Sequence, residues 1–194
     1  QAKIQVYTKR DQYNIELAAL QHEDKNVLLV LIDLYTGLRI GELCALSWPD
    51  FSPDRDYFDI SFILERLSKK WVKDHSEYTQ VPIIGAKPDA STALYLGPPK
   101  TESGKRRIHM SEQAISAFYD IELQQKEWGL YKPDGFVFLQ SNGNPYEPDG
   151  YRKLYKDVLR QAGVTYQKFH TLRHTFATRA FELQFDIPTL AEIL

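Results

Sequence analysis

Arg39 and Glu42 are the first side chains whose types and spacing could do chemistry together. They lie three residues apart, beginning two residues after Gly37, and this spacing places two helical side chains on one face. An arginine at such a helix junction is usually a surface or capping residue, and Glu42 is close enough to pair with it or to orient it. An ordinary helix salt bridge, which contributes little to stability, explains the same pair.

A second group, near the other end of the chain, consists of His170, Arg173 and His174. Spacings of three and four residues predict that they share one face of a helix. Two histidines one turn apart can bind zinc, but a metalloprotease pair needs a glutamate directly after the first histidine, where Thr171 stands. No cysteine or acidic cluster offers an obvious third ligand, so we predict no metal and a buried His174.

Basic residues gather in residues 100–109, where the one acidic side chain is Glu102. The basic members are Lys100, Lys105, Arg106, Arg107 and His109. The whole chain has a formal net charge of −2, from 24 basic and 26 acidic side chains, which by itself argues against a nucleic-acid binder. Binding requires a local basic surface, however, and this segment could provide one. A solvated hairpin explains the cluster equally well.

Three segments together resemble the tyrosine recombinase or phage integrase family. Residues 35–46 (YTGLRIGELCAL) resemble its first arginine box, residues 99–108 (PKTESGKRRI) its hairpin with the catalytic lysine, and residues 170–178 (HTLRHTFAT) its histidine-x-x-arginine box. The segments occur in the family's order, and the resemblance extends from about Thr8 to Leu194. The long segment between Trp48 and Pro99 is least like the family and is similar to the expanded sheet region of conjugative-transposon integrases.

The resemblance implies an enzyme that cuts and rejoins double-stranded DNA during integration or excision of a mobile element or phage. A tyrosine oxygen attacks phosphorus, a 5′-hydroxyl leaves, and the 3′-phosphotyrosine link preserves the bond energy, so no cofactor is expected. Two guanidinium groups, Arg39 and Arg173, would bind the nonbridging phosphate oxygens. Lys100, with Lys105 as the alternative, would protonate the leaving oxygen.

The remaining roles are also implied by the resemblance. His170 would donate a hydrogen bond to the phosphate or help take the tyrosine proton. Glu42 would support Arg39 without touching the phosphate. Lys105, Arg106 and Arg107 would contact DNA.

No residue of this chain stands at the place of the family's nucleophilic tyrosine. The last of the 12 tyrosines is Tyr166, which precedes His170. Tyr151, Tyr155 and Tyr166 are expected to be packing or surface residues. We therefore expect residues 1–194 to be a single catalytic domain, truncated before the nucleophile and inactive alone.

N-terminal core-binding and arm-binding domains are also expected to be absent from the chain. The full-length protein would be a homo-oligomer on DNA, a tetramer in synapsis. Two other readings stay open: a non-catalytic DNA-binding relative of the integrases, and an unrelated helical metalloprotein that uses His170 and His174.

The sequence pattern around these groups predicts a mainly helical α+β domain with a small antiparallel β-sheet. Helices are expected over residues 9–22, 24–35, 40–46, 112–128, 149–162 and 171–184, and a last one from near Pro188. Thr8 and Ser111 are N-cap residues, and Gly37 and Gly129 end helices. Aromatic and branched residues predict strands at 57–63, within 67–96 around a long polar loop, and at 106–110.

The composition, 43% hydrophobic and 26% charged, is typical of a globular protein. The apolar runs are too short to span a membrane, and residues 1–5 have no signal-peptide pattern. The single cysteine, Cys44, allows no internal disulfide and is expected in the core. These features favour a cytoplasmic protein, which the family resemblance would make bacterial or phage-encoded.

Overall fold

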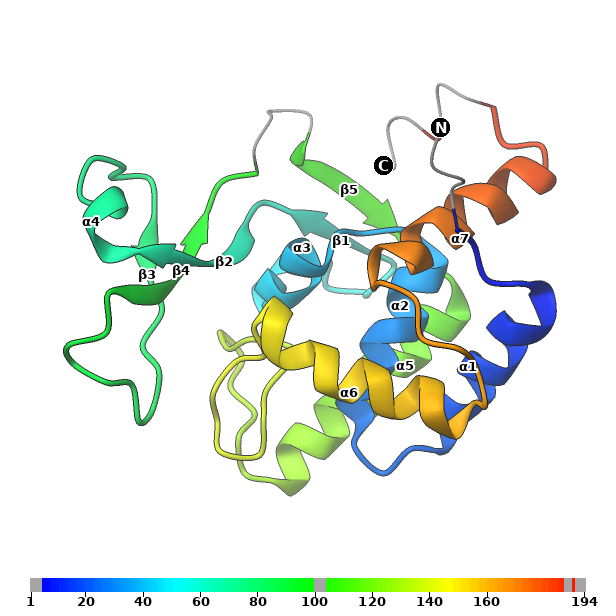
Figure 1. Cartoon of the computed structure of the whole chain (residues 1–194), viewed down its shortest axis with the longest axis horizontal. Coiled ribbons are helices and arrows are strands. Elements are labelled where there is room, and N and C mark those ends of the chain that lie inside the picture. Colours follow the sequence, from blue (N-terminus) through cyan, green and yellow to red (C-terminus); the bar gives the residue numbers. More distant parts are fainter. Residues whose placement is uncertain (1–4, 100–103, 187–189, 191–194) are drawn as a thin grey trace.

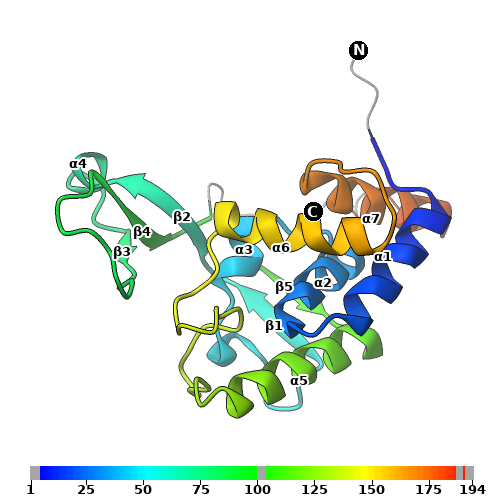
Figure 2. The same ribbon diagram turned by 60° about the horizontal axis from the view of Figure 1, so that its bottom comes forward.

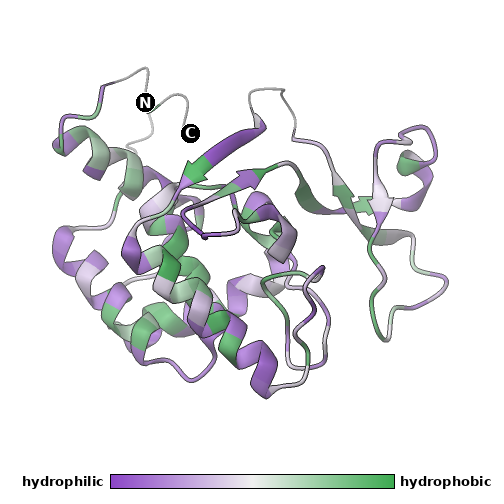
Figure 3. Cartoon of the chain, turned by 180° about the vertical axis from the view of Figure 1, so that it is seen from behind, coloured by the Kyte–Doolittle hydropathy of each residue, from purple (hydrophilic) through white to green (hydrophobic). Residues whose placement is uncertain are grey.

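The central helix is α2 (Leu29–Thr36), which follows the 3-10 turn η1 (Lys25–Leu28). The computed structural model describes residues 5–99, 104–186 and 190. All residues of α2 except Tyr35 are buried, because its sequence LVLIDLYT is almost entirely apolar. Figure 3 shows strongly hydrophobic ribbon at the centre of the helical part and hydrophilic ribbon on the outer turns.

Four longer helices surround this centre: α1 (Lys9–Gln21), α5 (Glu112–Glu127), α6 (Pro148–Gln161) and α7 (His170–Glu182). α1, α5 and α7 contact α2, while α6 packs on α1 and η1 (Figures 1 and 2). Thr8 caps α1 by accepting a hydrogen bond from the Asp11 N–H at 3.0 Å, and Ser111 caps α5 by accepting one from the Ala114 N–H. Both predicted caps are confirmed.

The β-structure is two small antiparallel sheets, whereas the sequence predicted one. β1 (Tyr57–Ile60) pairs with β5 (Arg106–His109), and β4 (Thr92–Gly97) lies between β2 (Ile63–Ser68) and β3 (Thr79–Gln80). The predicted strand 57–63 ends at Ile60, because β2 leaves to pair with β4. The β2–β4–β3 sheet and the short helix α4 (Lys69–Val72) project away from the helices (Figures 1 and 2).

Two shorter elements complete the connection between α2 and the sheets. α3 (Ile40–Ala45) follows the Gly37 turn and contacts β2, and the 3-10 turn η2 (Trp48–Asp50) contacts β1. Cys44 on α3 is buried, as predicted. The helix predicted from near Pro188 falls almost wholly outside the described residues.

The tyrosines near the C-terminal boxes lie where packing and surface residues were expected. Tyr151 and Tyr155 are fully buried on α6, and Tyr166 is exposed. No helix within residues 5–99 and 104–186 combines the length and apolarity needed to cross a bilayer.

Candidate functional site

The turn at Gly37 places Arg39. Gly37 ends α2 in the left-handed region, at φ +64°, and its N–H donates to the Asp33 carbonyl at 2.7 Å. Glycine adopts this conformation at no steric cost, so the chain can turn here, and Arg39 is the N-cap residue of α3. The Arg39 side chain is 56% exposed, far more than those of Arg106 and Arg173, the two other arginines near this turn.

Glu42 holds Arg39 from the buried side. Its carboxylate accepts a hydrogen bond from the Arg39 backbone N–H at 2.9 Å and another from Arg39 Nη1 at 3.1 Å. The Glu42 side chain is only 2% exposed. The pair predicted from the i, i+3 spacing therefore forms, and it is not an ordinary surface salt bridge.

Arg106 on β5 is the second partner of Glu42. Its Nη1 and Nη2 donate to the two carboxylate oxygens at 3.2 and 2.9 Å, and its side chain is 8% exposed. Burial raises the pKa of Glu42, but the hydrogen bonds and charges of Arg106 and Arg39 outweigh it, so the pKa is lowered overall and Glu42 is ionised. Arg106 was predicted to contact DNA, and in the structure its guanidinium faces Glu42.

Arg173 reaches the same turn from α7. It is buried, and its Nη1 donates to the Gly37 carbonyl oxygen at 2.6 Å. Burial lowers the pKa of Arg173, and the nearby positive charges of Arg39 and Arg106 lower it further. The negative charges of Glu42 and Asp33 raise it in part, and the pKa is lowered overall. The two arginine boxes, distant in sequence, are thus within electrostatic range of each other.

His170 stands in the first turn of α7, and its ring lies 4.4 Å from that of His174, edge to face. Partial desolvation lowers the pKa of His170, and the positive influence of His174, Arg173 and Arg39 adds to this, so its neutral form is favoured. His174 is partly exposed, whereas we predicted it buried. Among the described residues, no group of three His, Cys, Asp or Glu side chains could hold a metal ion.

Asp33 lies one turn before Gly37 on α2 and was missed from the sequence. It is fully buried, and neither carboxylate oxygen has a hydrogen-bond partner in the described part of the chain. Burial raises the pKa of Asp33 well above the usual range. The positive charge of Arg173 lowers this pKa in part, and the negative charge of Glu42 raises it further. A single acidic residue within an otherwise apolar helix was the signal that could have identified it.

Two other basic residues that were predicted to contact DNA, Lys105 and Arg107, lie in the described part of the chain. Arg107 is exposed, forms a two-bond pair with Asp59 at 2.9 and 3.0 Å, and stacks over Tyr57 at 3.6 Å. Lys105 directly precedes β5, and Lys100 lies outside the described residues.

A cleft of about 250 Å³ opens beside Arg39 and Glu42. Residues from α3, β2 and the ends of the segment that carries Lys100 line it: Arg39, Gly41, Glu42, Ile63, Glu65, Pro99 and Gly104. Pro99 and Gly104, which flank residues 100–103, therefore share this cleft with Arg39 and Glu42.

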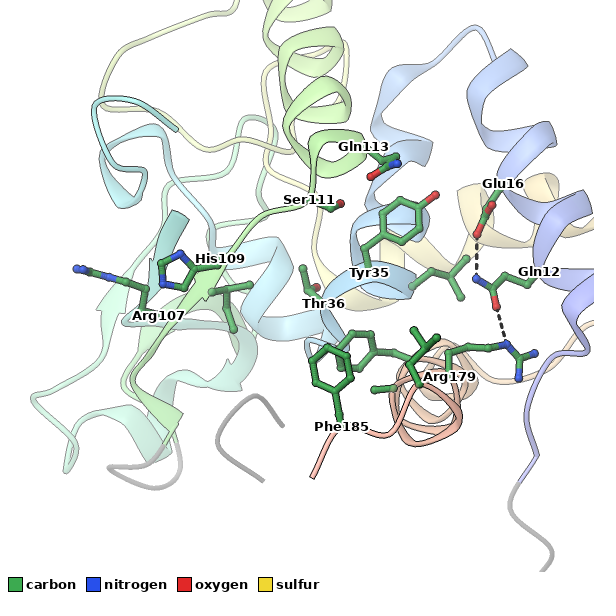
Figure 4. Close-up of a pocket in the computed structure, with 15 residues that line it drawn as sticks. Gln12, Glu16, Tyr35, Thr36, Arg107, His109, Ser111, Gln113, Arg179 and Phe185 are labelled. Carbon is green, nitrogen blue, oxygen red and sulfur yellow. Dashed lines mark hydrogen bonds between the residues drawn. The ribbon is translucent and has the colours of Figure 1, made fainter. Parts of the chain in front are cut away.

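A larger cavity of about 720 Å³ lies between α1, α2, β5 and α7, and Arg39, His170 and Arg173 are not among the residues that line it (Figure 4). Its polar groups are partly satisfied within the chain, since Gln12 donates to Glu16 at 2.9 Å and accepts from Arg179 at 3.1 Å. Its walls are mostly apolar, including Phe185. It is a poor site for a phosphate, and the Arg39 group is the candidate site.

Known proteins with similar sequences include a tyrosine recombinase and a transposase. The chain is 30% identical over 202 residues to a "Tyrosine recombinase XerC-like" protein of Caldanaerobacter subterraneus subsp. tengcongensis, covering 100% of this chain and 48% of that protein. It is 29% identical over 167 residues to the transposase from transposon Tn916 of Enterococcus faecalis, covering 79% and 35%. This chain therefore spans about half, or less, of these relatives.

Solved structures show the same fold at lower identity. The integrase of transposon Tn1549, in complex with a circular intermediate DNA, matches with a TM-score of 0.76 at 22% identity, covering 100% of this chain and 58% of that one. The XerA recombinase matches with a TM-score of 0.67 at 18% identity, covering 100% and 56%. The model of the phage integrase family matches residues 8–194. This chain belongs to the phage integrase family, the tyrosine recombinases.

Proposed function

We propose that residues 1–194 provide the phosphodiester-binding part of a site-specific recombinase that integrates or excises a mobile element or phage. The observation that supports this most is the convergence of Arg39 and Arg173 on the Gly37 turn beside an ionised Glu42. Two guanidinium groups in this arrangement match the charge that gathers on nonbridging phosphate oxygens in a phosphoryl-transfer transition state. Double-stranded DNA is the proposed substrate.

Each residue of the group has a distinct part in this proposal. Arg39 is exposed and fixed by Glu42, so it binds the phosphate with little loss of side-chain freedom. Arg173 is anchored to the Gly37 carbonyl and contributes a second positive charge to the site. His170 is exposed at the start of α7, with its neutral form favoured, and can exchange a proton with the attacking oxygen. Glu42 positions Arg39 and does not touch the substrate.

The proposed reaction conserves bonds. A tyrosine oxygen gives up its proton and bonds to phosphorus, the phosphorus–O5′ bond breaks, and the O5′ takes a proton from Lys100 or Lys105. Because the last tyrosine of the chain, Tyr166, precedes His170, we propose that the nucleophile is a tyrosine outside residues 1–194. We also propose that the whole recombinase works as a homo-oligomer on DNA.

The salt dependence of DNA binding tests the phosphate site. A fluorescent duplex is titrated with the 194-residue chain, with Arg39→Ala and with Arg173→Ala at several salt concentrations. Each variant should weaken binding and reduce the slope of log affinity against log salt by roughly 0.9, the value for one lost phosphate contact.

Arg152→Ala is the matched control, because Arg152 is 62% exposed on α6 and pairs only with Asp149 among the described residues. It should leave the slope unchanged. Equal losses for all three variants would contradict a localised phosphate site.

A covalent-adduct assay separates the enzyme from the non-catalytic DNA-binding alternative. Residues 1–194 should yield no protein–DNA band on a denaturing gel. A version that includes the tyrosine-bearing segment should yield one, and this band should disappear with His170→Ala. A tyrosine adduct formed by residues 1–194 alone would contradict the proposed placement of the nucleophile.

A further inference from the structure

We infer that Arg106 is a positioning residue for Arg39, which it holds in place through the shared carboxylate of Glu42. The inference rests on the proposed phosphate-binding role of Arg39. It also replaces the direct DNA contact that the sequence predicted for Arg106.

The register of β5 separates Arg106 from its neighbour Arg107. Successive side chains of a strand point to opposite faces, and β5 is fixed by pairing with β1, where Arg106 opposes Ile60 and Arg107 opposes Asp59. Arg106 therefore turns inward, at 8% exposure, while Arg107 turns outward, at 49%. Its guanidinium is directed toward Glu42, to which both of its terminal nitrogens donate.

The hydrogen bonds of Glu42 show how Arg106 can act at a distance. Oε1 accepts from Arg39 Nη1 and from Arg106 Nη1, and Oε2 accepts from the Arg39 backbone N–H and from Arg106 Nη2. Arg106 thus binds both oxygens and fixes the plane of the carboxylate. Because the same two oxygens orient Arg39, the direction of its guanidinium depends on Arg106.

Burial makes this dependence strong. Glu42 is 2% exposed, so it stays ionised only while cations compensate its lost hydration. Arg39, which is largely exposed, retains water and compensates less than the buried Arg106 does. Arg106 Nη1 also donates to the Gly104 carbonyl at 2.9 Å, which ties the end of the lysine-bearing segment to the same carboxylate.

A double-mutant cycle on DNA binding tests the inference. Arg106→Met should weaken binding of a duplex by the 194-residue chain by about 3- to 10-fold, within the range for directly coupled neighbours, and Arg106→Lys should recover part of the loss. In an Arg39→Ala background, Arg106→Met should add nothing. If Arg106 instead contacts DNA, its loss persists in full in that background, and the inference is overturned.

Arg107→Met is the matched control from the same strand, and its effect should be the same with and without Arg39. The cycle also separates this inference from the proposed function. If Arg39→Ala itself does not weaken binding, the phosphate site is wrong; if Arg39→Ala weakens binding and the Arg106 loss is additive, only the positioning role is wrong.

An NMR titration of the Glu42 carboxyl gives a readout that does not depend on DNA. Removing Arg106 should raise the Glu42 pKa, because burial then lacks its main compensation, and removing Arg107 should not. Folding of each variant is confirmed from the same spectra. An unchanged Glu42 pKa in Arg106→Met would refute the coupling.

Discussion

Glu42→Ala should destabilise the folded chain by about 3–5 kcal/mol, the usual cost of removing one partner from a buried ion pair. We use the value for a buried pair because the Glu42 side chain is 2% exposed and the Arg106 side chain is 8% exposed. Alanine leaves the Arg106 guanidinium buried without the carboxylate that accepts two of its hydrogen bonds. The cost comes mainly from the desolvation of Arg106, which the carboxylate no longer offsets, rather than from the lost attraction.

Urea unfolding followed by far-UV circular dichroism measures this loss. Asp59→Ala is the matched control, since it removes the partner of Arg107 on the same strand from a pair that is 44% and 49% exposed. Exposed pairs contribute at most about 1 kcal/mol, so Asp59→Ala should shift the midpoint little. The free energy of unfolding of a typical domain is about 5–15 kcal/mol, so the loss in Glu42→Ala should appear as a clearly lower urea midpoint with an unchanged m-value.

The pH dependence supplies an internal check. The folded-state pKa of Glu42 is lowered, so its contribution is complete above the pKa of the unfolded chain and is lost as pH falls through the folded pKa. Wild type and Glu42→Ala should therefore converge in acid. The reasoning is refuted if the two variants differ by less than about 1 kcal/mol at neutral pH, because Arg106 would then regain water without cost.

Three further predictions concern Asp33, Gly37 and the pair formed by Tyr7 and Tyr155. Burial raises the pKa of Asp33, so the free energy of unfolding of the wild type falls as pH rises above about 3.9, the usual pKa of an aspartate in an unfolded chain. Asp33→Asn should therefore gain stability relative to wild type as pH rises, which urea midpoints from pH 4 to 7 measure. Gly37→Ala at φ +64° should cost about 1–2 kcal/mol, seen by calorimetry as a Tm lower by roughly 2–8 °C; an unchanged Tm would show that the turn accepts a side chain. The hydroxyls of Tyr7 and Tyr155 are 2.6 Å apart and buried, so each single change to phenylalanine should cost about 1–3 kcal/mol and the double change less than their sum; additive losses would rule out the bond.

Local sequence signals determined the helical part of the fold and the family. The first turns after Thr8 and Ser111 follow from short side chains that cap backbone N–H groups, and the reversal at Gly37 follows from a glycine after an apolar run. These effects act within a few residues, so they can be read without tertiary structure. The three family segments were recognised in the same way, and the family model confirms that membership.

The tertiary structure decided what the local pattern left open. A strand pattern says that Arg106 and Arg107 face opposite ways, but only the pairing of β5 with β1 decides which one meets Glu42. In the same way, the β2–β4 pairing divided the predicted sheet, and the packing of α7 on α2 placed Arg173 against the Gly37 carbonyl. Sequence by itself determined which residues could do the chemistry, because type and spacing are local properties. Which of them are buried and which are exposed depends on contacts between distant segments, and only the folded chain makes those contacts.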